Sequence, residues 1–320
     1  MKEVGGFLGL DLIRRNDIHA SAIGFNTARN ALKVLLEEIG RPTNNYLSVA
    51  LPAFLCPDVA IMLKRSELKI KLEFYNIGND LKPVLKDGLQ YDVFYYYDVF
   101  GLVGPPDKMF ATHTIVDSAH SFYQPPENGF HSIYSARKFL GVPDGALLYT
   151  WLPIENREPA ESWQSSSHLL KRVDVNAETS YAYFLEAEAA LSRSPALGIS
   201  NLSRALIEAS DTDFICKARR NNFEALHARF RGSNELSHLI DRVLGRDGFV
   251  PFMYPLLLPT GKMIRRQLIE NRIYSPTLWS AIAEASEASD YEKHMSLNTV
   301  HLPVDQRYTL DDMNWIAGKI

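Results

Sequence analysis

The sequence predicts an α/β protein with a mostly parallel sheet flanked by helices, followed by a smaller α+β region. Helix-like and strand-like segments alternate over roughly the first 150 residues, and this alternation is typical of parallel strands joined by crossover connections. From about residue 160, Ala, Glu and Arg recur at helical spacing, and roughly the last hundred residues mix short strands with helices. We therefore expect a large domain over residues 1–195, and linking helices with a small α+β domain over 196–320.

Apolar spacing and turn residues place the individual elements. The first helix is expected over 27–40, where Gly40 stands in the place of a C-terminal cap. Further helices are expected at 56–66, 178–194, 202–210, 215–230 and 261–272, and a last one from Thr309, which Asp311 and Asp312 follow. Strands are expected at 45–54, 68–77, 92–101, 112–120 and 251–259, and one after the glycine turn within 131–150.

Composition excludes several classes of partner. The 320 residues are 46% hydrophobic and 22% charged, as in an ordinary globular protein, and the net charge of -4 with scattered basic residues argues against nucleic-acid binding. There is no apolar run of membrane-spanning length and no secretory signal at the start, so we expect a cytoplasmic protein. Cys56 and Cys216 are too few for a zinc site or a disulfide framework, so no metal is expected.

Two segments carry residues typical of chemistry. IVDSAH (115–120) is an apolar strand that ends in Asp117, and ligands gather at the carboxyl ends of strands in open α/β sheets. Taken alone, Asp117 is more readily a turn or capping residue. About twenty residues on, SARKFLGVPDGALLY (135–149) contains Lys138 before a Gly/Pro/Asp/Gly turn and a strand. The two segments together favour a ligand site.

The order of several segments resembles the DegT/StrS family of pyridoxal-phosphate-dependent sugar aminotransferases, which have the fold-type I, aspartate aminotransferase-like architecture. The similar segments run nearly end to end: TARNAL (27–32), LPAFLCP (51–57), YYYDVFG (95–101), IVDSAH (115–120), SARKFLGVPDGALLY (135–149), RIYSPTLWS (272–280) and MSLNTVHLPVDQRYTLDDM (295–313). Each motif is weak alone, but their order and the spacing from Asp117 to Lys138 are fairly specific.

The resemblance implies roles for three residues. Asp117 would face the pyridine nitrogen of pyridoxal 5'-phosphate and keep it protonated, so that the ring withdraws electrons from the substrate carbon. His120 would hydrogen-bond the cofactor's phenolic oxygen, although a histidine in the core or on the surface is the alternative interpretation. Lys138 would form the Schiff base and then move the proton between substrate and cofactor carbons.

Residues near two helix and strand ends are candidates for holding the phosphate. Thr27 and Ala28 open a helix, whose free N–H groups and dipole attract anions, and Arg29 follows them. Ser135 and Arg137, close to Lys138, could add a hydroxyl and a guanidinium. Here the sequence departs from the family, because the serine expected five residues before the lysine is replaced by Ile133.

Ring stacking and substrate contacts are less defined. The place of the family's stacking aromatic falls near Cys56, which leaves Phe54 or a residue of the Tyr95–Tyr97 run as substitutes. Those tyrosines are interpreted mainly as core or interface filling. The segment ARRNN (218–222) is interpreted as a solvated helix face. Tyr274 and Trp279 resemble substrate-side wall residues of the family.

The implied function is transamination from an amino acid, expected to be glutamate or glutamine, to a keto sugar nucleotide in a homodimer with shared active sites. One alternative uses the same cofactor differently, as in a dehydratase, where histidine typically replaces the lysine; Lys138 argues against it. A second alternative is a catalytically idle homologue that binds the cofactor and serves a regulatory role. The acceptor could also be something other than a nucleotide sugar.

Overall fold

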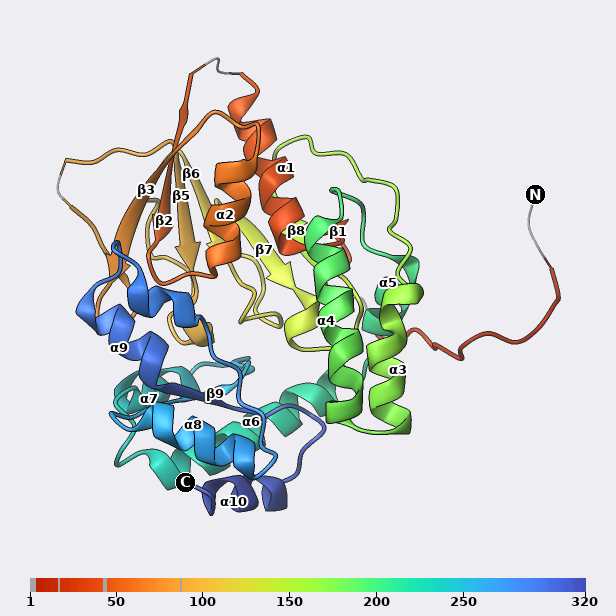
Figure 1. Ribbon diagram of the computed structural model, residues 1–320. Helices are drawn as coiled ribbons and strands as arrows, with labels where there is room; N and C mark the ends of the chain where they lie inside the picture. The colour runs from red at the N-terminus through yellow and green to blue at the C-terminus, as the bar shows by residue number, and fades with distance from the viewer. Residues whose placement is uncertain (1–3, 17, 43–44, 87) are drawn as a thin grey trace.

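The computed structural model describes residues 4–16, 18–42, 45–86 and 88–320, and an eight-stranded mixed sheet forms its upper half in Figure 1. The strand order is β1-β8-β7-β6-β5-β2-β3-β4. The five central strands from β7 to β3 are parallel, whereas β1, β8 and β4 pair antiparallel with their neighbours. The predicted fold class, a mostly parallel sheet flanked by helices with a smaller α+β part, is confirmed.

The strands of the large sheet are β1 (Ile23–Phe25), β2 (Leu47–Pro52), β3 (Ile70–Ile77), β4 (Pro83–Val84), β5 (Val93–Tyr97), β6 (His113–Asp117), β7 (His131–Ser135) and β8 (Ala146–Tyr149). Its helices and the linking helices are α1 (Ala28–Gly40), α2 (Pro57–Arg65), α3 (Ser167–Asp174), α4 (Ala177–Arg193) and α5 (Asn201–Ala209). The remaining elements are α6 (Thr212–Phe230), α7 (Ser237–Leu244), β9 (Tyr254–Leu257), α8 (Gly261–Glu270), α9 (Asp290–Asn298), β10 (Thr299–Leu302) and α10 (Leu310–Ala317). Among the described helices, none is long and apolar enough to cross a membrane.

Helix α1 forms where its sequence pattern predicts. The Thr27 hydroxyl accepts the Asn30 N–H at 3.0 Å, which satisfies one of the free donors at the helix start. The predicted cap at Gly40 is wrong. Gly40 is the last helical residue, and Arg41 caps the helix in the right-handed conformation while its N–H bonds to Glu38, so no left-handed glycine is needed there.

Side-chain alternation in the parallel strands separates two faces of the sheet. Tyr97, Asp117 and Ile133 are register partners on β5, β6 and β7, so they share one face. Tyr96 and Val116, one residue earlier on their strands, are partners on the other face. No helix joins β5 to β6 or β6 to β7 in the described structure beyond a short 3-10 turn at Val99–Gly101. Loops therefore surround the carboxyl ends of these strands.

The C-terminal region lies below the strand ends in Figure 1, around the antiparallel pair β9 and β10. The predicted start of the last helix is confirmed, because Thr309 and Asp312 form a reciprocal capping box. The interpretation of 218–222 as a solvated face is wrong for two residues: Arg219 and Asn222 are each only 2% exposed, because both side chains bond to backbone carbonyls of neighbouring segments. The domain boundary at residue 195 stays a prediction.

Glu292 ties α9 to the large sheet. It is fully buried, and its carboxylate accepts the Ile77 N–H at 3.0 Å, the Asn76 amide at 2.7 Å and the Ser289 N–H at 2.7 Å. We predict that Glu292→Ala lowers the free energy of unfolding by about 3 kcal/mol, because buried donors lose their acceptor. Urea unfolding followed by circular dichroism measures this. The exposed Glu287→Ala serves as control, and equal effects of the two substitutions would contradict the prediction.

Candidate functional site

Asp117 ends β6 with its side chain buried and well supplied with donors. One carboxylate oxygen accepts the Ala119 N–H at 2.9 Å, and the other accepts the Tyr95 hydroxyl at 2.8 Å. Burial raises the pKa of Asp117, whereas these two bonds and the nearby Lys138 oppose the rise. The carboxylate is therefore held in place, and its two hydrogen bonds and the nearby lysine favour the charged form.

Lys138 lies at the end of the short 3-10 turn that follows β7. Burial lowers the pKa of its amine, and the cations Arg137 and Arg29 lower it further, while Cys56 and Asp117 act in the opposite direction. These couplings place the amine within electrostatic reach of Asp117 and of the ends of α1 and α2. The acid that ends β6 and the lysine of the turn after β7 thus lie at the same carboxyl edge of the sheet, where ligands gather in open α/β sheets.

His120 is fixed by a hydrogen bond and by ring packing. Its Nδ1 is 2.7 Å from the Tyr97 hydroxyl, and its ring stacks on Phe252 with 4.2 Å between the centroids. The Lys138 amine lies 5.4 Å from the centre of the same Phe252 ring. Burial, followed by the charge of Lys138, lowers the pKa of His120 well below its ordinary value, so the imidazole is neutral at physiological pH.

Positive charge collects beside the start of α1. Arg29 pairs with Asp58 of α2 at 2.8 Å, and Arg137 pairs with Glu188 of α4. Burial and the neighbouring Arg29 lower the pKa of Arg137 to about 10. The Arg137 Nε is buried and has no hydrogen-bond partner in the described part of the chain. Two guanidinium groups and the free N–H groups of a helix start therefore face the same region.

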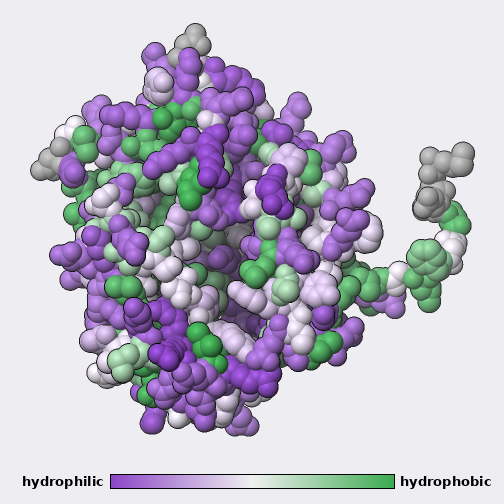
Figure 2. All heavy atoms as spheres, in the orientation of Figure 1, coloured by the Kyte–Doolittle hydropathy of each residue, from purple (hydrophilic) through white to green (hydrophobic). Residues whose placement is uncertain are grey.

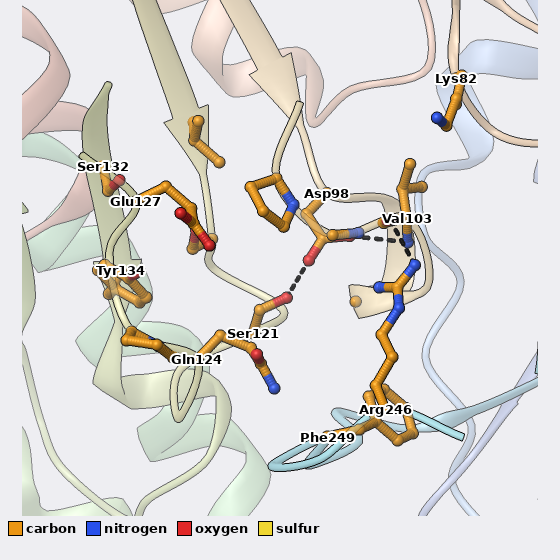
Figure 3. Close-up of a pocket in the computed structure, with 16 residues that line it drawn as sticks. Lys82, Asp98, Val103, Ser121, Gln124, Glu127, Ser132, Tyr134, Arg246 and Phe249 are labelled. Atoms are coloured by element: carbon orange, nitrogen blue, oxygen red, sulfur yellow. Dashed lines mark hydrogen bonds between the residues drawn. The ribbon is translucent and has the colours of Figure 1, made fainter. Parts of the chain in front are cut away.

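The surface of the molecule is hollowed near its middle, where the ends of α1 and α2 approach α4 (Figure 1, Figure 2). A separate cavity of about 290 Å³ lies on the other face of the sheet, with Val116, Ser132 and Tyr134 in its lining. In that cavity Ser121 bonds to the buried Asp98, whose carboxylate also accepts the Val103 N–H (Figure 3). The loop that carries His120 borders this cavity through Ser118 and Ser121, but Asp117 and Lys138 do not line it.

The chain is similar to known proteins in structure but not detectably in sequence. No family model matches the sequence, and no curated protein matches it in sequence. A DegT/DnrJ/EryC1/StrS aminotransferase from Brucella abortus superposes with a TM-score of 0.60 at 13% identity, over 93% of this chain and 84% of the other. The chain has the fold of these sugar aminotransferases. PseC from Helicobacter pylori, an aminotransferase of pseudoaminic acid biosynthesis, gives 0.61 at 14% identity, over 93% and 85%.

A dehydratase has the same fold. GDP-4-keto-6-deoxymannose-3-dehydratase, with a trapped PLP-glutamate geminal diamine, gives a TM-score of 0.56 at 9% identity, over 93% of this chain and 87% of the other. At these identities the likeness establishes the fold, and a fold alone does not select a reaction. The reaction has to be inferred from the residues of the site.

The structure brings most of the predicted site residues into one region. The charge of Lys138 affects the pKa values of both Asp117 and His120. The Trp279 ring lies nearly parallel to the His120 ring, with the ring planes 9° apart. Thr27 caps the start of α1, with Ala28 as the first helical residue. Their proposed roles stay predictions.

Tyr274 and Ser135 are two further predicted residues, and Ser135 lies on the sheet face of Asp117. Tyr274 is 46% exposed and its hydroxyl bonds to Glu178 at the start of α4, away from Asp117. Ser135 ends β7 on the same sheet face as Ile133, without a side-chain bond to the start of the turn that it precedes.

The interpretation of the tyrosine run as mainly core filling is confirmed, because all three tyrosines are buried in the core, but two of them also contact predicted site residues. Tyr95 and Tyr97 are buried, but their hydroxyls bond to Asp117 and His120. Only Tyr96 points to the other face, where it stacks with Phe110. The signal was present in the sequence, since two alternate tyrosines precede a parallel strand that ends in an acid.

Two further residues of the site had no signal in the sequence. Phe252 and His301 come from the C-terminal region, and both rings reach the strand ends: Phe252 stacks on His120, and His301 lies 5.0 Å from the Phe100 ring. The His301 Nε2 is buried without a partner in the described residues, and burial lowers the pKa of His301 to about 3. Only the tertiary structure could identify them.

The lowered pKa of Lys138 predicts unusual reactivity. An amine reacts with acetic anhydride only when it is deprotonated, so Lys138 should be acetylated at a lower pH than the exposed Lys262. Competitive labelling of the full chain, dialysed to remove any bound aldehyde, with quantification of the two peptides by mass spectrometry measures this. If Lys138 became acetylated only at the same pH as Lys262 or at a higher pH, the prediction would be contradicted.

Proposed function

We propose that the chain is a pyridoxal-phosphate-dependent aminotransferase of the DegT/StrS type. The observation that carries the proposal is the placement of Asp117 at the end of β6 and of Lys138 in the turn after the adjacent parallel strand β7, where the two charges influence each other and Arg29 and Arg137 also act on the amine. A carboxylate, an amine and a cationic helix start are the three groups that this cofactor requires at its ring nitrogen, its aldehyde and its phosphate.

The side chains present fit the cofactor. Arg137 offers a buried Nε without a partner in the described chain, and a phosphate oxygen could accept its proton in a hydrogen bond. Asp117 has both oxygens oriented by donors, yet it remains electrostatically coupled to Lys138. Lys138 would hold the cofactor, with Arg29, Arg137 and the N–H groups after Thr27 at its phosphate and Asp117 at its ring nitrogen.

Bound pyridoxal phosphate would supply an electron-withdrawing ring that stabilises negative charge at the substrate carbon. Asp117 would keep the ring nitrogen protonated, and the Tyr95 hydroxyl would keep the carboxylate in position. The Nζ of Lys138, with its pKa lowered by burial, would take the proton from the substrate carbon and return it as an acid. One lysine would therefore both attach the cofactor and move the proton.

Neutral His120 would serve as the neighbour of the cofactor's phenolic oxygen, with Tyr97 fixing its orientation. Phe252, Trp279 and Phe54 would exclude water around the reacting groups. We propose glutamate or glutamine as amino donor and a keto sugar nucleotide as acceptor, by analogy with the sugar aminotransferases that share the fold, and we place the reaction in the cytoplasm.

A catalytically idle homologue and a dehydratase are the alternatives. Asp117 and Lys138 both being present argues against an idle protein, and a lysine rather than a histidine at 138 argues against the dehydratase. A donor-dependent conversion of the bound cofactor to its amine form separates an enzyme from a passive binder. A panel of keto sugar nucleotides and simple keto acids, offered to that amine form, then identifies the acceptor.

Lys138 is predicted to be the attachment point. After incubation with pyridoxal phosphate and reduction with borohydride, the wild-type peptide containing residue 138 should gain the cofactor mass, and Lys138→Ala should lose it, because the amine is gone. Peptide mass spectrometry measures the adduct. Lys82→Ala, which lies at the separate cavity, is the matched control and should retain it. An adduct that persists on another lysine in Lys138→Ala would contradict the assignment.

We further propose that the protein is a homodimer and that helices α3 and α4 lie in the interface. These helices expose apolar side chains although they are folded against each other: Leu170 is 61%, Tyr181 58% and Leu185 49% exposed. The same helices border the site, because Glu188 of α4 pairs with Arg137. A second copy covering them would close the hollow from the side of α4.

The dimer is predicted to depend on this apolar surface. Leu185→Asp, one turn from Tyr181 on α4, should give a particle of the 36.2 kDa chain mass, whereas the wild type should sediment with twice that mass, because a charge in an apolar contact is costly to bury. Sedimentation velocity measures the two masses. Lys262→Glu, at the exposed start of α8, should stay dimeric. A monomeric wild type, or a dimeric Leu185→Asp protein, would contradict the prediction.

A further inference from the structure

Arg219 of α6 is a cation that the reaction does not use, yet it is almost completely buried at 2% exposure. Its guanidinium has no carboxylate among its hydrogen-bond acceptors in the described residues. It donates instead to the Gln306 side chain at 2.9 Å, to the Phe139 carbonyl at 2.9 Å, and to the carbonyls of Pro251 and Phe252 at 3.1 and 3.0 Å. Burial lowers the pKa of this guanidinium to about 10.

These acceptors belong to segments that are far apart in the sequence. Phe139 directly follows Lys138, so its carbonyl fixes the backbone of the turn that carries the amine. Phe252 comes from the segment before β9, and its ring contacts both Lys138 and His120. Gln306 follows β10 and donates to the same Phe139 carbonyl at 3.0 Å. One planar group therefore holds the lysine turn and the Phe252 segment at a fixed separation.

We propose that Arg219 is a positioning residue that holds the Lys138 turn against the Phe252 ring. Burying a cation whose hydrogen bonds all go to uncharged acceptors is costly, although the charge of Asp305 opposes that cost. Its rigid fork can bond two carbonyls in fixed directions, which a lysine cannot do. The Phe139 ring also lies against the guanidinium, 4.7 Å from its centre. The positioning keeps the Lys138 amine packed over the Phe252 ring, and burial of this kind lowers its pKa.

The inference rests on the proposed function only for the role of Lys138 in the reaction. The positioning of Lys138 by Arg219 can be measured without cofactor or substrate. The experiment is the pH profile of Lys138 acetylation by acetic anhydride in the full chain, dialysed to remove bound aldehyde. Arg219→Lys keeps the charge and loses the fork, and Arg219→Met loses both. Both should move the midpoint for Lys138 upward by about one pH unit, as water reaches the amine.

Arg220→Met is the matched control, since the neighbouring arginine on α6 bonds to Glu224 and to the Leu244 and Arg246 carbonyls instead. It should leave the midpoint unchanged even if it lowers the melting temperature. Gln306→Leu removes the second donor to the Phe139 carbonyl and should also raise the midpoint, by less than the Arg219 substitutions do. If both Arg219 variants fail to fold, the midpoint of Gln306→Leu tests the positioning instead. An unchanged midpoint in a folded variant of Arg219 or Gln306, or an equal shift in Arg220→Met, overturns the proposal.

Failure of the wild-type protein to trap the cofactor at Lys138, together with a shifted midpoint in the Arg219 variants, would reject the proposed function and retain the positioning role. Trapping that persists with an unchanged midpoint would do the reverse.

Discussion

Asp117 and Lys138 stand at the ends of β6 and β7, where burial disfavours the charge on both side chains. Removing opposite charges from water costs several kcal/mol for each ion, and here the Ala119 N–H and the Tyr95 hydroxyl offset part of that cost for the acid. The arrangement needs parallel pairing of β5, β6 and β7, because only that pairing sets the tyrosine, the acid and the lysine turn at one edge. The rest of the site is built around this pair.

The C-terminal region completes the site from the other side. Phe252 and Trp279 pack on the two rings fixed by the large sheet, His120 and Tyr97. Arg219 connects that region to the lysine turn through backbone carbonyls. The site is therefore held by interactions between the two regions as well as within the sheet. A polar anchor of this kind fixes distances more sharply than apolar contact, because its hydrogen bonds are directional.

Much of this structure follows from local sequence patterns. The parallel sheet, the start of α1 at Thr27 and the capped start of α10 come from apolar spacing and capping residues, and the order of Asp117 and Lys138 along the chain indicates the site. Contacts between distant segments could not be predicted. Phe252 lies in none of the similar segments, and within segment 295–313 nothing singled out His301. The buried state of Arg219 runs against the helical pattern that predicted a solvated face. Their roles arise only where the C-terminal region meets the strand ends.

The most direct test of the central claim is a crystal structure of the protein grown with pyridoxal phosphate. The proposed geometry predicts density for one ring joined to the Nζ of Lys138, with the Asp117 carboxylate within hydrogen-bond distance of the ring nitrogen. It also predicts that the phosphate lies at the start of α1 beside Arg137. Density that leaves Asp117 and Lys138 facing different cavities, or that places the ring elsewhere, would contradict the assignment whatever the fold.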